Sequence, residues 1–136
     1  MPNDFWKPYR ESDKRYMPAI TKARWVRRFQ IGSYQAVVGT DCESVGLIHY
    51  THVMYVINDK DKHSCLAVTS EYTDNIGNDG NRCLCLFFGG SHFNSGVSKD
   101  WIDLDNFVHR ALELIIEPLG ITEIPQEIPL QQSSGQ

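Results

Sequence analysis

Between residues 25 and 88 the sequence alternates between short runs of β-forming residues and clusters of turn residues, and this alternation limits the possible folds more than any other feature. Runs of this length, bounded by glycine, asparagine and aspartate, are typical of strands joined by tight connections. The first two runs flank Gly32 and Ser33, a two-residue loop with glycine first that suits a type II′ hairpin turn. The alternation therefore predicts a five-stranded antiparallel β-meander, with strands at residues 25–31, 34–39, 45–57, 65–72 and 82–88.

A single stretch after Asp103 has the periodicity of a helix. Asp103 fits the N-cap position, because its carboxylate can accept a hydrogen bond from a free first-turn N–H, and Gly120 fits the end of the helix. The sequence thus predicts an α+β domain in which a C-terminal amphipathic helix packs on one face of the sheet. The apolar residues that recur at spacings of three and four are Leu104, Phe107, Val108, Ala111, Leu112, Ile115 and Leu119.

The chain of 136 residues has the length of one ordinary domain, and 41% hydrophobic with 22% charged residues supports a packed core. We expect residues 1–24 to be a basic and aromatic segment of that domain and residues 25–120 to form its α+β body. Residues 121–136 are expected to be a loose tail. Gly89 and Gly90 are expected to let the chain leave the sheet after the fifth strand.

The charge is distributed unevenly along the chain. Residues 1–28 contain eight Lys/Arg and three Asp/Glu, whereas residues 29–136 contain five and fourteen. An acidic body repels nucleic acid, so only the basic segment could bind it, and we keep nucleic-acid binding as the weakest of three functional hypotheses. The residues that could hold phosphates and stack bases there are Lys22, Arg24, Trp25, Arg27, Arg28 and Phe29.

Several classes of protein and of site are disfavoured by the sequence. No stretch contains the roughly 20 consecutive apolar residues that a membrane helix needs, so we expect no membrane association. Four cysteines are too few for a disulfide scaffold, and they lack the CxxC pairs of structural zinc sites. On a strand without a bulge, His49 and His52 point to opposite faces and cannot share an ion. We therefore expect a cytoplasmic protein with reduced thiols, no metal and no cofactor.

Alternation along the strands also indicates which residues share a face, if the hairpins contain no bulges. Hairpin geometry then places Val53 opposite Val68, and Thr69 opposite Cys85. One face collects the residues that we expect to seat the C-terminal helix, namely Leu47, Val53, Tyr55, Leu66, Val68, Leu84, Leu86 and Phe88.

The opposite face is also largely apolar, and a sheet that is apolar on both faces needs two covers. The sequence supplies one strong helix, so the second cover is the N-terminal segment, a second copy of the chain or a ligand. We expect this face to collect Phe29, Ile31, Tyr34, Ala36, Val38, Ile48, Tyr50, His52, Met54, Ala67, Thr69, Glu71, Cys83, Cys85 and Phe87. Its expected binding residues are Tyr34, Tyr50, His52, Met54, Thr69, Glu71 and Phe87.

The surplus apolar face favours a non-catalytic binding or protein-interaction module that acts as a chaperone, an inhibitor or a ligand sensor. Its expected partner is another protein or a second copy, with a homodimer as the default, and a small-molecule ligand is the alternative. The competing hypothesis is a small enzyme in which Cys85 attacks, His52 acts as the base and Glu71 or Tyr50 assists. Tyr50, Glu71 and Cys83 form one row across the sheet in this geometry.

Overall fold

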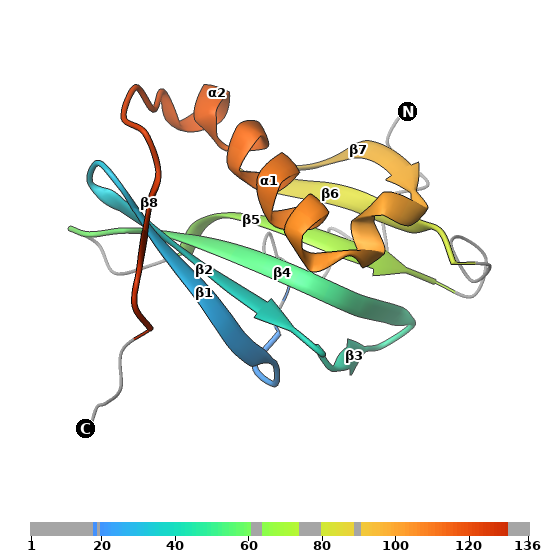
Figure 1. Cartoon of the computed structure of the whole chain (residues 1–136). Coiled ribbons are helices and arrows are strands. Elements are labelled where there is room, and N and C mark those ends of the chain that lie inside the picture. The colour runs from blue at the N-terminus through green and yellow to red at the C-terminus, as the bar shows by residue number, and fades with distance from the viewer. Residues whose placement is uncertain (1–17, 19, 61–63, 74–79, 89–90, 131–136) are drawn as a thin grey trace.

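Eight strands form one antiparallel sheet in the computed structural model, which describes residues 18, 20–60, 64–73, 80–88 and 91–130. The strands follow the order β7-β6-β5-β4-β2-β1-β8, and the short β3 pairs with β4. Figure 1 shows β1 and β2 running obliquely to β6 and β7, as expected for a strongly twisted sheet. The bounds are β1 (Arg24–Ile31), β2 (Tyr34–Thr40), β3 (Ser44–Val45), β4 (Ile48–Asn58), β5 (Ser64–Tyr72), β6 (Arg82–Phe88), β7 (Ser91–Ser98) and β8 (Gln126–Ile128).

The α+β class and the antiparallel sheet are confirmed, but the predicted number of five strands is wrong. The chain does not leave the sheet after β6, because β7 pairs antiparallel with β6. β7 has the sequence SHFNSGVS, which contains few β-forming residues, and its strand conformation comes from pairing with its neighbour. Within the segment expected as a tail, β8 pairs with β1 at the opposite edge of the sheet.

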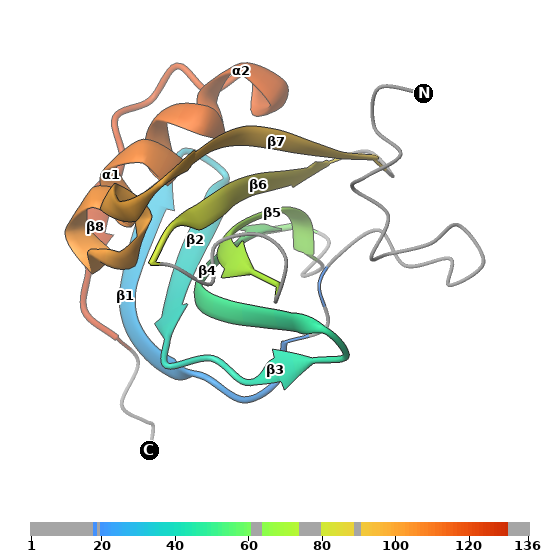
Figure 2. The same cartoon turned by 90° about the vertical axis from the view of Figure 1, so that its right-hand side faces the viewer.

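The predicted helix is present as α1 (Leu104–Leu114), which follows the 3₁₀ helix η3 (Lys99–Ile102) and continues into α2 (Ile116–Leu119). The Asp103 carboxylate accepts a hydrogen bond of 2.9 Å from the Asn106 N–H and caps α1 as expected. Gly120 ends α2 in the left-handed conformation with φ of 62°. Figure 2 shows the helices gathered on one side of the curved sheet.

The main core lies between α1 and the sheet. Phe107, Val108, Ala111 and Ile115 are the buried residues of the helical segment. The buried sheet and loop residues in the same cluster are Phe29, Ile31, Ala36, Val38, Met54, Val56, Leu66, Val68, Leu84 and Ile121. Five of these, Phe29, Ile31, Ala36, Val38 and Met54, were expected on the other face, so this part of the face assignment is wrong.

Two β-bulges between β4 and β5 explain the error. The pairing of Ile57 with Ser64 agrees with the bulge-free hairpin, but the register shifts between Val56 and Ile57. Val53 therefore lies opposite Thr69 rather than Val68, and the faces of the middle of β4 are exchanged relative to β5. A second shift between Tyr50 and His52 restores the expected register at the far end of the strand. The β5–β6 register is as predicted, with Thr69 opposite Cys85.

The bulges also change which residues of the sheet pack against α1. Val53 and Tyr55 lie outside the helix-side core and belong to the opposite face, while Leu47 is 81% exposed.

Among the described residues, no helix is long and apolar enough to cross a membrane.

Candidate functional site

His52 lies beneath the helices, on the face opposite Cys85. Its Nε2 donates a 2.7 Å hydrogen bond to the Ile102 carbonyl, and its Nδ1 accepts one of 2.9 Å from the Thr40 hydroxyl. The ring also packs against Phe107 at 5.3 Å between centroids. Burial lowers the pKa of His52, so the neutral imidazole is favoured. Both ring nitrogens are engaged in holding the fold, and the expected pairing of His52 with a Cys85 nucleophile is not assembled.

The seven residues expected to form one binding surface are divided between the two faces. Met54 is fully buried in the helix-side core, and Tyr34 packs against that core. Tyr34, Met54 and His52 therefore do not lie on the sheet face opposite α1. The register shift near the β4–β5 turn reverses the side-chain directions in the middle of β4. The four that share the face opposite α1 are Tyr50, Thr69, Glu71 and Phe87.

A compact group of polar side chains remains on that face, and we call Tyr50, Thr69, Glu71, Cys83 and Cys85 the Tyr50–Glu71 cluster. Glu71 pairs with Tyr50 on one side and with Cys83 on the other, so these three residues form the row that the sequence predicts. Thr69 and Cys85 form the next row along the same face. The relative exposure of every member is 4% or less.

Glu71 is a buried carboxyl group with a single hydrogen-bond donor among the described residues. The Thr69 hydroxyl donates to its Oε1 at 2.5 Å. Burial raises the pKa of Glu71 to about 7, and the Thr69 hydrogen bond opposes this shift only in part. Glu71 is therefore divided between its neutral and charged forms near neutral pH.

Tyr50 is 4% exposed, and its hydroxyl has no hydrogen-bond partner in the described part of the chain. Burial raises the pKa of Tyr50, and Glu71 raises it further. Large buried side chains with a polar tip usually find a partner for that tip. The Tyr50 hydroxyl is thus a buried polar group with no structural bond to explain it.

The two cysteines of the cluster contact each other, and Cys85 is not activated as a nucleophile. Their Sγ atoms are 3.4 Å apart, and the Cys83 thiol donates to Asn94 Oδ1 at 3.4 Å. The hydrogen bond with Cys83 and burial both raise the pKa of Cys85 well above its ordinary value. A nucleophilic thiolate needs the opposite shift, so the geometry does not favour Cys85 as a nucleophile.

No group of three or more His, Cys, Asp or Glu side chains in the described residues is arranged to hold a metal ion. His49 contacts the Ser44 hydroxyl at 2.8 Å and stacks on Tyr72, with the ring centroids 4.7 Å apart. The His49 and His52 rings are therefore engaged separately.

Pro18 and Ile20 lie beside the cluster, and Ile20 forms part of its apolar wall. Ile20 packs with Ile48, Tyr50 and Val53. The Tyr55 hydroxyl donates to the Pro18 carbonyl and accepts a 3.1 Å hydrogen bond from the Ile20 N–H. The role of Tyr55 was missed from the sequence, because the bulge-free register placed it on the helix face. Residues 1–17, considered as a cover for this face, lie outside the described residues.

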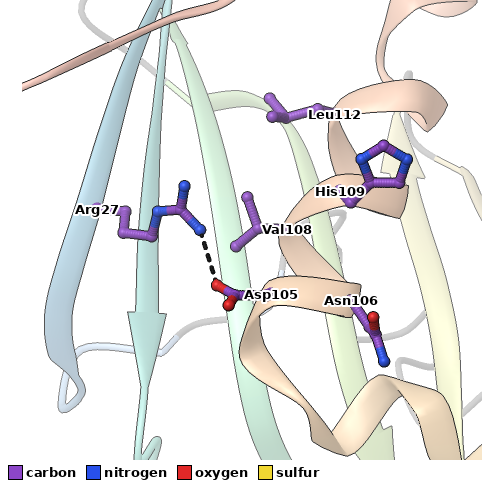
Figure 3. Close-up of a pocket in the computed structure, with 6 residues that line it drawn as sticks. All are labelled: Arg27, Asp105, Asn106, Val108, His109 and Leu112. Atoms are coloured by element: carbon purple, nitrogen blue, oxygen red, sulfur yellow. Dashed lines mark hydrogen bonds and ion pairs between the residues drawn. The ribbon is translucent and has the colours of Figure 1, made fainter.

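A shallow groove of about 490 Å³ separates β1 from α1 (Figure 3), and its lining combines Arg27, Asp105, Asn106 and His109 with the apolar Val108 and Leu112. Arg27 crosses it and binds the Asp105 carboxylate at 3.1 Å and the Glu127 carboxylate at 2.7 Å. Arg24 is paired with Asp41 at 2.9 Å. Two of the basic residues considered for nucleic-acid binding are thus neutralised by carboxylates of the same chain.

The Tyr50–Glu71 cluster therefore combines polar groups that the fold does not use with an apolar wall, whereas the groove at Arg27 is occupied by its own ion pairs. Comparisons of the chain with protein-family models, with curated proteins and with solved structures each give no match.

Proposed function

We propose that the protein is a non-catalytic ligand-binding module whose binding surface is the sheet face opposite α1. The Tyr50–Glu71 cluster supplies the polar contacts, and Ile48 and Val53 beside it supply apolar contacts. The observation that carries this proposal is the Tyr50 hydroxyl, which is buried without a partner among the described residues.

The cost of the cluster to the fold supports a functional role. A buried hydroxyl without a hydrogen bond costs about 1–3 kcal/mol of desolvation, which a phenylalanine at position 50 would avoid. Glu71 adds a second cost, because burial disfavours its charged form. Functional sites are where proteins keep groups that are unfavourable for folding alone.

The depth of the cluster favours a small molecule over a protein partner. Glu71 is 3% exposed and Tyr50 is 4% exposed, so neither side chain is presented on an open surface. Small-molecule sites combine a few convergent polar groups with apolar walls, and the arrangement beside Ile48 and Val53 has this character.

Acid–base catalysis on the same face is a second candidate, and one observation favours it. The pKa of Glu71 is about 7, which is the range that suits a general acid or base at neutral pH. Titration of the full chain with a thiol reagent at neutral pH separates this candidate from the nucleophilic mechanism. Slow modification of all cysteines agrees with a non-nucleophilic Cys85, and one rapidly labelled cysteine would restore the enzyme hypothesis.

The binding proposal is tested with benzyl alcohol, a small apolar probe that carries one hydroxyl. We expect nuclear magnetic resonance shifts of the full chain to concentrate on the methyl groups of Ile48 and Val53. Tyr50→Phe should weaken this binding, and Tyr34→Phe, which removes a tyrosine hydroxyl at the helix-side core, should not. Shifts confined to the groove at Arg27, or no saturable shifts, would contradict the proposal.

Two other occupants of this face are separate outcomes of the same experiment. Light scattering that shows a dimer, together with benzyl alcohol shifts that appear only on dissociation, would assign the face to a second copy. Deletion of residues 1–17 that creates benzyl alcohol binding absent from the full chain would assign the face to that segment. Either result overturns the ligand-binding proposal.

A further inference from the structure

Among the described residues, the titratable groups around the Tyr50–Glu71 cluster are acids. β4 contributes Tyr50 and Tyr55, β5 contributes Glu71, and β6 contributes Cys83 and Cys85. Cys42 packs against the same apolar wall, and burial raises its pKa to about 12. Each of these groups is neutral or negative, so the cluster has no positive charge of its own.

The nearest basic side chains are directed elsewhere. No lysine, arginine or histidine in the described ranges shifts the pKa of Glu71 or of Tyr50. Arg82 donates to the Thr51 hydroxyl at 2.7 Å and lies over the Tyr72 ring, and its charge acts on His52 on the helix face. Within the described part of the chain, no basic side chain supplies a positive charge to the cluster.

Two oxygens of the cluster, carried by directly paired residues, have positions left open for a hydrogen bond. Thr69 occupies Oε1 of Glu71, and Oε2 receives no donor from the described residues. The Tyr50 hydroxyl, on the residue directly opposite, has no partner there either. A primary ammonium group carries several N–H donors and one positive charge, and it can donate to both oxygens at once.

We propose that the ligand is a primary amine with an apolar body, whose ammonium group binds between Glu71 Oε2 and the Tyr50 hydroxyl. This inference rests on the binding function proposed above and names the ligand class for the same site. The apolar body lies against Ile48 and Val53, which pack with Tyr50. An anionic ligand is disfavoured, because no basic side chain of the described residues faces the cluster to balance its charge.

Binding of the ammonium is coupled to loss of a proton from Glu71. Neutral Glu71 releases its proton to solvent, and the resulting carboxylate pairs with the ammonium, so the total charge is balanced. Since the pKa of Glu71 is about 7, the carboxylate fraction increases about tenfold between pH 6 and pH 8. The affinity for an amine that stays protonated over this range should increase by the same factor.

Three probes of similar shape test the inference on the full chain: benzylamine, benzyl alcohol and benzoate. Binding is followed at pH 6 and pH 8 through the methyl groups of Ile48 and Val53 and through the side-chain ¹³Cδ of labelled glutamate. We expect benzylamine to bind at least tenfold more tightly than the other probes at pH 8. It should also lower the pH at which Glu71 titrates, and benzyl alcohol should not.

Two variants assign the effect to the carboxyl group. Glu71→Gln should remove the preference for benzylamine and its pH dependence while benzyl alcohol still binds. Glu117→Gln, which removes a carboxylate from an exposed position, should change neither. If Glu71→Gln does not fold, the titration of Glu71 in the unmodified chain still shows whether benzylamine binds to this carboxyl group.

The outcomes separate this inference from the proposed function. If benzyl alcohol or benzoate binds at Ile48 and Val53 as tightly as benzylamine, the amine assignment is wrong and the binding function stands. If none of the three probes shifts the resonances of Ile48 and Val53, the proposed binding function is wrong, and the proposed ligand class is wrong as well.

Discussion

His52 and Ser70 on one face of the sheet are bonded differently from Tyr50 and Glu71 on the other, although Trp101 Nε1 beside the helix-side core also lacks a partner among the described residues. Beneath the helices, Ser70 donates to the Trp101 carbonyl at 2.7 Å, and His52 donates to the next carbonyl, that of Ile102, while it accepts from Thr40. On the opposite face, Tyr50 has no partner and Glu71 has one within the described residues. Residues of the same strands therefore serve two different purposes.

This contrast identifies the polar groups that the fold requires. The bonds of His52 and Ser70 hold η3 against β4 and β5, at the point where the chain turns from the sheet into α1. Their removal leaves the Trp101 and Ile102 carbonyls without these donors. No comparable bond depends on the Tyr50 hydroxyl, so its removal should not weaken the fold.

The largest expected effect is on the helix face. His52→Ala removes the ring that packs on Phe107 and leaves the Ile102 carbonyl without its donor, so we expect a loss of about 3–5 kcal/mol in the free energy of unfolding. Urea denaturation measures it. His109→Ala, at a position whose side chain is 80% exposed, is the control and should change stability by less than about 0.5 kcal/mol. A loss below about 1 kcal/mol for His52→Ala would mean that the fold does not depend on the hydrogen bonds of His52.

The second effect comes from the proton on Glu71. The folded protein holds this proton up to about pH 7, whereas the unfolded chain loses it near the ordinary value of 4.5, so stability decreases as the pH rises from 5 to 8. The decrease from this group is roughly 2–3 kcal/mol. Urea denaturation across that range should show it in the unmodified chain and not in Glu71→Gln. Parallel pH profiles for the two chains would mean that Glu71 is ionised in the fold, with a cation that balances it.

A smaller effect separates two tyrosines of the same strand. Tyr55→Phe removes the hydroxyl that bonds Pro18 and Ile20, and we expect it to lower stability by about 1–2 kcal/mol. Tyr50→Phe removes a hydroxyl without a partner, and it should leave stability unchanged or raise it by about 1 kcal/mol. Thermal unfolding of both variants at one pH provides the measurement. A loss of stability in Tyr50→Phe equal to that in Tyr55→Phe would give the Tyr50 hydroxyl a structural role.

The sequence was sufficient for those features that depend on local pattern. The apolar spacing after Asp103 predicts α1 and its cap, and the alternation along β5 and β6 predicts that Thr69 lies opposite Cys85. The row formed by Tyr50, Glu71 and Cys83 was also predicted, because the two register shifts in β4 and β5 cancel at that end of the strands.

The features that were missed depend on three-dimensional fit. A bulge changes the pairing without a fixed sequence signal, so the shift between Val56 and Ile57 could not be read from alternation, and it moved Met54 and His52 beneath the helix. β7 was missed because its strand conformation comes from β6 rather than from its own residues. The state of the Tyr50 hydroxyl was beyond prediction as well, since burial and the absence of a bond arise only from packing.

The smallest expected effect lies at the edge of the helix face, where Arg27 joins β1 to α1 and to β8 through Asp105 and Glu127. The Arg27 side chain is 27% exposed, so solvent screens both ion pairs, and we expect Arg27→Gln to cost about 0.5 kcal/mol. Because salt weakens exposed pairs, the difference from the unmodified chain should shrink between low and high ionic strength. Urea denaturation at two salt concentrations measures this. A large loss of stability that salt does not change would place Arg27 with His52 among the groups that the fold requires. The whole helix side would then differ from the Tyr50–Glu71 cluster in this respect.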